Sequence, residues 1–76
     1  MKEGLLCYNN TTERYSIFFY SGGAPLDLHC GDAFWVQINK DGEWLQTHIE
    51  YDHDEKEWYL PGIGFRIDHL KAQIRD

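Results

Sequence analysis

The residues most capable of chemistry are four histidines and two cysteines, and no two of them have the sequence spacing of a pair of metal ligands. Protein zinc sites reuse short ligand spacings such as CxxC or HxxxH, and the sequence contains neither. We therefore expect no metal and no cofactor. His29 and Cys30 are neighbours, but adjacent side chains of a strand point to opposite sides and cannot act as a thiolate and its base. Both Cys7 and Cys30 are predicted to be free thiols that behave as small buried apolar residues.

Carboxylates are concentrated in residues 50–57, a segment with five acids and one lysine. The close spacing of these acids is similar to that of a calcium-binding loop, but the glycine of the sharp turn is missing and Lys56 interrupts the acids. A solvated hairpin tip is the better interpretation. Asp32 follows Gly31 at a turn, where its carboxylate would accept backbone N–H groups. With no phosphate loop or nucleophile motif in the sequence, we expect that the protein is not an enzyme.

Size and charge narrow the function classes further. Seventy-six residues predict one domain covering 1–76, and 42% hydrophobic residues suffice for a core. The formal charge of −6 repels a phosphate backbone and so disfavours nucleic acid as a partner. No apolar run is long enough for a membrane span, and no signal-peptide pattern precedes Cys7, so we expect a cytoplasmic location and no membrane partner.

The best-defined element is a hairpin in the middle of the chain. Asp41-Gly42 lies between two alternating segments, 33–39 and 44–51, and this dipeptide favours a two-residue type I′ turn with positive φ at both positions. The expected core-facing pairs are Ile38 with Leu45, Val36 with Thr47 and Phe34 with Ile49. The opposite face would pair Asn39 with Trp44, Gln37 with Gln46 and Trp35 with His48.

The other elements are also short strands separated by turn residues. Two of them, 4–8 and 14–20, surround a loop of Asn and Thr residues and predict a first hairpin. A short strand follows over 58–60, and the last segment is predicted to form a helical turn near Asp68 and then a strand. Five to six short antiparallel strands predict an all-β fold, a small barrel or a sandwich, and closure into a barrel would hide the edges of the sheet.

One run of residues resembles a known group of proteins. It consists of Leu28-His29-Cys30-Gly31-Asp32, an alternating strand, the segment 42–50 opened by Gly42-Glu43-Trp44, and Trp58-Tyr59-Leu60. This order resembles small proteins of Gram-positive bacteria and their mobile elements that are catalogued as a domain of unknown function. It is also similar to SH3-like barrels. The resemblance implies an SH3-like barrel and supplies no activity.

The most plausible working surface is aromatic. Trp35, Trp44 and His48 fall on the non-core face of the central hairpin, and Tyr59 joins them if its strand neighbours point inward. Such a cluster is typical of surfaces that bind a peptide, a proline-rich segment or stacked bases. The alternative is that residues 5–8 or the terminal segment cover this face as a second core layer. We predict a non-enzymatic module that binds a protein or peptide through this face, in an oligomeric state that the sequence leaves open.

Two other functions remain open at this point. The chain would bind nucleic acid if its cations were gathered on one side of the barrel, with aromatic rings stacking on bases. The cations in question are Arg14, Arg66, Lys71 and Arg75. Alternatively, the acidic segment 50–57 would act as a mimic of nucleic acid.

Overall fold

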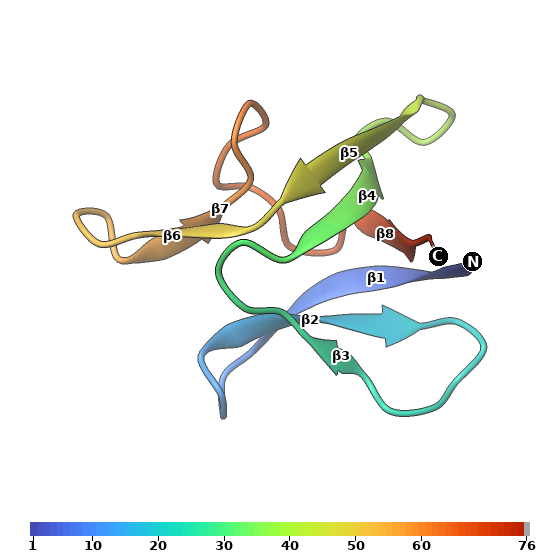
Figure 1. The fold of residues 1–76 in the computed structure, drawn as a ribbon, viewed down its shortest axis with the longest axis horizontal. Helices are drawn as coiled ribbons and strands as arrows, with labels where there is room; N and C mark the ends of the chain where they lie inside the picture. The colour runs from blue at the N-terminus through green and yellow to red at the C-terminus, as the bar shows by residue number, and fades with distance from the viewer. Residues whose placement is uncertain (76) are drawn as a thin grey trace.

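A computed structural model describes residues 1–75, which form eight strands and no helix. The strands are β1 (Lys2–Asn9), β2 (Arg14–Phe19), β3 (Leu26–Asp27), β4 (Ala33–Gln37), β5 (Trp44–His48), β6 (Glu50–Asp52), β7 (Glu57–Tyr59) and β8 (Lys71–Ile74). Six of them pair antiparallel in the order β3-β2-β1-β8-β4-β5, and β6 and β7 pair separately (Figure 1). The expected small all-β fold is confirmed. Closure into a barrel is not, because β3 and β5 are the two edges of an open sheet.

The last strand joins the two halves of the six-stranded sheet. On one side β8 pairs with β1, with Ala72 opposite Gly4, and on the other it pairs with β4, with Ala72 opposite Val36. The two ends of the chain therefore lie side by side (Figure 1). The predicted terminal strand is confirmed, but the expected helical turn before it is a single β-turn. In this turn the Leu70 N–H donates to the Ile67 carbonyl over 3.3 Å, and His69 has a φ of 69°.

The first hairpin forms where the sequence predicts it. Asn9 closes the connection between β1 and β2, because its side-chain oxygen accepts the Thr11 N–H over 2.9 Å. Its carbonyl accepts the Glu13 N–H over 2.8 Å. Glu13 takes a positive φ of 58° at the end of this loop. The resulting register places Tyr8 directly opposite Tyr15.

The central hairpin has the predicted faces but a different turn and register. Neither Asp41 nor Gly42 has a positive φ, and the turn bond runs from the Gly42 N–H to the Asn39 carbonyl over 2.8 Å. The strands end earlier than expected, so Val36 pairs with Leu45 and not with Thr47. Since the shift is two residues, the alternation of the two faces is kept, and Phe34, Val36, Thr47 and Ile49 are buried as predicted. Ile38 and Leu45 were also predicted to face the core, but they are 40% and 42% exposed, because Ile38 lies beyond the end of β4 and Leu45 belongs to the edge strand β5. The type I′ turn and the pairing derived from it were wrong.

The predicted strand over 44–51 is divided at Ile49. Its N–H donates to the Asp32 carbonyl over 3.1 Å, and its carbonyl accepts the Gly31 N–H over 2.7 Å. These bonds tie Ile49 to the turn before β4, and the chain then leaves the large sheet to form the β6–β7 hairpin. The Asp32 carboxylate stabilises the same turn by accepting the His29 N–H over 2.8 Å. The structural role predicted for Asp32 is thus confirmed.

A single core cluster combines residues of the large sheet with residues of the segments that connect the strands. Its nine buried members are Leu6, Ile17, Leu28, Phe34, Val36, Ile49, Leu60, Ile67 and Ala72. Trp58 and Tyr15 are partly buried and pack against this cluster. Nowhere in residues 1–75 is there a helix long and apolar enough to cross a membrane.

Candidate functional site

The structure brings together three of the four aromatic site residues that the sequence predicts. Trp44 pairs with Gln37, two residues from Trp35, and His48 pairs with Ala33, so Trp35, Trp44 and His48 share one face of β4 and β5. His48 is exposed, whereas both indoles are partly buried. The surface therefore exists, although its two largest rings are not fully available to a partner.

The terminal segment covers part of this face. The Arg75 guanidinium lies 3.7 Å from the centroid of the Trp35 ring, a stacked cation–π arrangement. Arg75 is itself held by a hydrogen bond to the Gln73 side chain, which is buried opposite Trp35. Tyr59, the fourth predicted residue, belongs to the β6–β7 hairpin and contacts Phe65, with ring centroids 5.2 Å apart.

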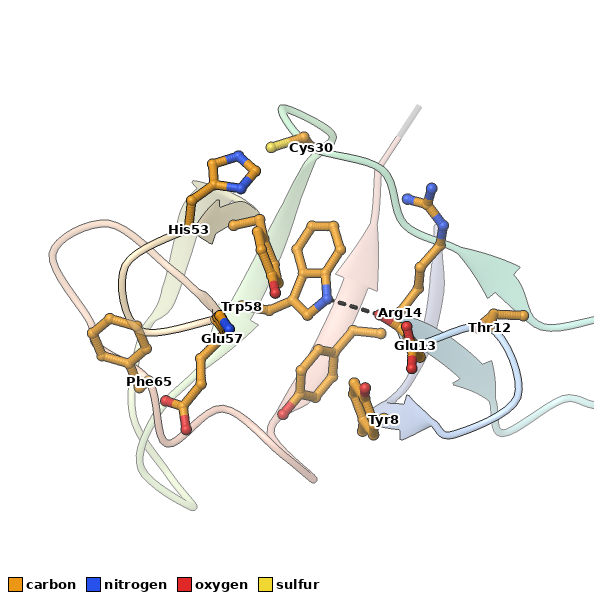
Figure 2. A pocket seen from close by; sticks show the side chains of 12 residues that line it. Tyr8, Thr12, Glu13, Arg14, Cys30, His53, Glu57, Trp58 and Phe65 are labelled. Carbon is orange, nitrogen blue, oxygen red and sulfur yellow. Dashed lines mark hydrogen bonds between the residues drawn. The ribbon is translucent and has the colours of Figure 1, made fainter.

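A groove of about 810 Å³ lies between the turn end of β1–β2 and the β6–β7 hairpin (Figure 2). This volume falls within the range of pockets that enclose a ligand. Five aromatic residues line it: Tyr8, Tyr15, Tyr51, Trp58 and Phe65. Phe65 is also the residue that Tyr59 contacts, so Tyr59 adjoins the groove. Trp35, Trp44 and His48 do not line it.

Two cross-strand aromatic pairs form the two walls of the groove. Tyr8 and Tyr15 face each other across β1–β2 with ring centroids 5.3 Å apart and an interplanar angle of 65°. Tyr51 and Trp58 face each other across β6–β7 at 5.0 Å and 66°. Both are edge-to-face contacts, which aromatic rings prefer over direct stacking. Each wall is therefore an aromatic corner, by which we mean a pair of edge-to-face rings beside a hairpin tip.

Trp58 links the two walls. Its indole N–H donates to the Glu13 carbonyl over 3.0 Å, a bond between the small sheet and the first hairpin (Figure 2). The Arg14 guanidinium lies 6.0 Å from the centroid of the same ring. Trp58 also packs on the core, so it contacts the core, the first hairpin and the groove at once.

The lining of the groove has as many acids as cations, but the β6–β7 hairpin beside it is acidic. The β6–β7 hairpin includes the acidic segment 50–57, whose tip is ordered by the Asp52 carboxylate; this accepts the Asp54 and Glu55 N–H groups over 2.9 and 3.1 Å. The hairpin tip predicted for this segment is confirmed. Glu13 and Glu57 line the groove with the cations Arg14 and Lys56. Burial, followed by the influence of Asp68, raises the pKa of Tyr15 above its usual value.

The cysteines are free, as predicted, but neither is a buried core residue. Cys30 is exposed at the edge of the groove, and its thiol lies 3.5 Å from the Glu50 carboxylate. It is exposed because it belongs to the turn before β4, outside any strand. Cys7 is partly buried beside Asp68 and His69. Burial, and then the Asp68 carboxylate, raises the pKa of the Cys7 thiol.

The cations required for a nucleic-acid surface are not gathered in one patch. Arg14 lies opposite Asn9 at one end of β1, whereas Lys2 at the other end is opposite Ile74, the residue before Arg75. At the usual rise of a strand these two ends are about 23 Å apart. Arg14 and Arg75 also cover indole rings, on Trp58 and Trp35 respectively.

The groove was not predicted from the sequence, although the aromatic pair within each hairpin could have been. The Asn and Thr loop predicts the first hairpin, and that hairpin alone places Tyr8 opposite Tyr15. The acidic tip likewise places Tyr51 opposite Trp58. The sequence does not show that the two hairpins face each other, because the contact between Trp58 and Glu13 joins residues far apart in the chain.

Comparisons with known proteins agree with this fold. A family model described as "Domain of unknown function (DUF5348)" matches residues 4–74. A crystal structure of a protein from Ruminococcus gnavus, a structural genomics target, is similar to the chain at 37% identity and a TM-score of 0.70. The similarity covers 95% of this chain and 99% of that one. A search of curated proteins finds no match. The predicted resemblance to a domain of unknown function is confirmed, and the chain belongs to the DUF5348 family.

Proposed function

We propose that the protein is a non-enzymatic interaction module that binds an extended, cationic, proline-containing segment of a partner protein in the groove between its two hairpins. The observation that carries the proposal is that two aromatic corners, Tyr8–Tyr15 and Tyr51–Trp58, line one groove from two different hairpins. Extended proline-rich segments dock in aromatic-lined grooves because their backbone is already ordered before binding.

Charge favours a cationic segment over an acidic one. The β6–β7 hairpin beside the groove has five acids and one lysine in residues 50–57, and the whole chain has a formal charge of −6. Arg14, a cation in the groove, lies within cation–π range of Trp58, 6.0 Å from the ring centroid. An incoming arginine or lysine would therefore meet carboxylates around the aromatic walls, and complementary charges of this kind speed association and select the partner.

The groove is a better candidate than the face of Trp35 and Trp44. Arg75 stacks on Trp35 at 3.7 Å and occupies the position that a ligand would take, whereas in the groove Arg14 stays 6.0 Å from the Trp58 ring centroid and two aromatic corners line the site. The two sites are far enough apart in the fold to be distinguished by one experiment. The three tryptophans serve as separate reporters of the two sites, since Trp58 belongs to the groove and the other two belong to the β4–β5 face.

The experiment is a titration of ¹⁵N-labelled protein with two synthetic peptides that differ only in charge. One contains prolines and arginines, and the other has glutamate in place of each arginine. We expect the arginine peptide to shift the indole N–H signal of Trp58 and to leave those of Trp35 and Trp44 unchanged. A Trp58→Phe variant assigns the signal. Movement of the Trp35 and Trp44 signals alone would instead place binding on the β4–β5 face, and no movement with either peptide would reject the proposal.

A matched pair of tyrosine variants tests the contribution of the groove wall. Tyr8 in the groove and Tyr20 outside it are 41% and 57% exposed, so neither substitution removes core packing. Loss of one aromatic anchor costs about 1–2 kcal/mol of binding free energy, which is about 5- to 30-fold in affinity. We expect this loss in Tyr8→Ala and an unchanged affinity in Tyr20→Ala. Equal affinities in the two variants would contradict the assignment.

The same titration addresses the nucleic-acid alternative. The separation of Arg14 from Arg75 and the negative formal charge count against it. Addition of single-stranded oligo(dT) at low salt should leave all three indole signals in place. Shifts near the cations that disappear as salt is added would support nucleic-acid binding instead of the peptide.

A further inference from the structure

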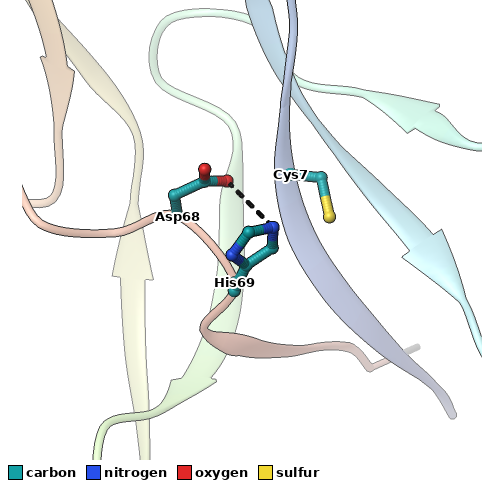
Figure 3. A group of neighbouring side chains, drawn as sticks. All are labelled: Cys7, Asp68 and His69. Atoms are coloured by element: carbon teal, nitrogen blue, oxygen red, sulfur yellow. Dashed lines mark ion pairs between the residues drawn. The ribbon is translucent and has the colours of Figure 1, made fainter.

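Three side chains with metal-binding atoms meet beside β1, outside the groove. The Cys7 thiol, one oxygen of Asp68 and one nitrogen of His69 all lie within 4.8 Å of one another (Figure 3). Cys7 belongs to β1, and Asp68 and His69 form the turn before β8. Cys7 and Tyr8 are neighbours on a strand, so their side chains point to opposite sides, and none of the three cluster residues lines the groove.

Backbone hydrogen bonds hold this turn against β1. The His69 N–H donates to the Leu6 carbonyl over 2.6 Å, and the Leu6 N–H donates to the Leu70 carbonyl over 2.9 Å. The Tyr8 N–H donates to an oxygen of the Asp68 carboxylate over 3.2 Å. These bonds hold the two backbone segments together on both sides of Cys7, which keeps the three residues close to one another.

The backbone of His69 is left-handed, a conformation that is uncommon outside glycine and that histidine adopts more readily than most residues. Its φ of 69° lies in the left-handed region, where residues with a Cβ are rare and asparagine is among the few that are favoured. This φ belongs to the turn that carries the imidazole to a position near both the thiol and the carboxylate. Its Nε2 is 3.9 Å from Asp68 Oδ1, the ion pair drawn in Figure 3.

We propose that Cys7, Asp68 and His69 form a binding site for a single zinc-like divalent cation. Thiolate sulfur, imidazole nitrogen and carboxylate oxygen are the three ligand types that zinc takes in proteins. Tetrahedral coordination at ordinary bond lengths places ligand atoms about 3.5 Å apart, so the atoms here need to move by only about 1 Å.

The fourth coordination position faces outwards. The side chains of Asp68 and His69 are 49% and 70% exposed, so water or a residue of a partner can reach an ion held between them. The spacing of these ligands explains why the sequence predicts no metal: Cys7 is separated from the other two ligands by most of the chain. Only the pairing of β1 with the segment leading into β8 brings them together.

Cobalt(II), which reports its ligands by absorption, is the probe for this site. Co²⁺ is titrated into the full chain, produced without a polyhistidine tag and with its thiols reduced, and Zn²⁺ is then added as a competitor. We expect one equivalent of Co²⁺ to give a thiolate-to-cobalt charge-transfer band together with the intense visible bands of tetrahedral cobalt. Zn²⁺ should displace it. Absence of the charge-transfer band would overturn the proposal.

Three variants remove one ligand each while preserving the fold. Cys7→Ser is nearly isosteric, Asp68→Asn keeps an oxygen that accepts the Tyr8 N–H, and His69→Asn suits the left-handed backbone. Changes around a metal commonly cost 10- to 100-fold in affinity even beyond the ligands themselves, so we expect at least about a tenfold loss in each variant. Cys7→Ser should also abolish the charge-transfer band.

Cys30→Ser is the control, because Cys30 is the second free thiol and is exposed elsewhere. We expect its cobalt spectrum and affinity to equal those of the unmodified chain. A band that is lost in Cys30→Ser and retained in Cys7→Ser would assign the metal to the wrong thiol and refute the site. An affinity unchanged by His69→Asn, with the fold intact by circular dichroism, would refute it as well.

Discussion

Gly4 occupies a position in β1 where no other residue fits. A Cβ added there would lie 2.1 Å from the Phe18 carbonyl oxygen and 2.8 Å from the Phe19 Cα. Both atoms belong to the backbone of β2, so no side-chain rotation relieves the overlap. Gly4 lies near the point where β1 pairs with both β2 and β8. We therefore predict that Gly4→Ala strongly destabilises the fold.

The size of the effect follows from the overlap. Relief requires the two strands to separate by about 1 Å, and overpacking of this kind costs about 1–3 kcal/mol. Because only backbone can move at Gly4, we expect a value near 3 kcal/mol. Domains of this length have a free energy of unfolding of roughly 4–11 kcal/mol. A loss of about 3 kcal/mol would lower the melting temperature by roughly 12–24 °C.

The assay is thermal and urea unfolding followed by circular dichroism, with Gly31→Ala as the comparison. Gly31 has open space around its missing Cβ but a φ of 90°, so alanine there costs backbone strain alone, about 1–2 kcal/mol. We expect Gly4→Ala to be the more damaging of the two. A fall of less than about 4 °C in Gly4→Ala, or a fall no larger than that of Gly31→Ala, would refute the reasoning.

Three further predictions concern single interactions. Trp58→Phe removes the hydrogen bond to the Glu13 carbonyl and should lower the free energy of unfolding by at least about 0.5–1.5 kcal/mol, measured by urea denaturation. Asp32→Ala removes the acceptor of the His29 N–H and should cost about 1 kcal/mol in the same assay, most of it restored by Asp32→Asn. Burial raises the pKa of Tyr15 in the folded state above 10.0. The neutral phenol therefore stabilises the fold fully below about pH 10, and this contribution is lost as the pH rises through the folded-state pKa. Tyr15→Phe should flatten the loss of stability measured from about pH 9 to about pH 11.

Local patterns were sufficient for the strands and their faces, but not for their ends. Alternation alone assigns Phe34 and Val36 to the core and Trp35 to the other face, because the side-chain period of a strand is two residues. The turn was misjudged since Asp41-Gly42 favours a type I′ geometry in isolation. In the folded chain the Gln37 side chain instead donates to the Gly42 carbonyl over 2.8 Å and holds a longer loop.

The pairing of strands far apart in the chain could not be predicted from the sequence. Nothing in residues 71–74 indicates that β8 inserts between β1 and β4, because a short alternating strand fits many neighbours equally well. That insertion brings Cys7 to His69 and leaves the small sheet facing the first hairpin. The aromatic residues of the groove are thus visible as pairs within each hairpin, whereas the groove itself is a product of tertiary structure.

The position of β8 also has a consequence for how the chain folds. The strand that comes last along the sequence contacts both β1 and β4, so the units β3-β2-β1 and β4-β5 each keep an unsatisfied edge until it arrives. Neither unit is a complete intermediate during synthesis, and the native state should form in one cooperative step with the high contact order typical of slow, millisecond-to-second folders.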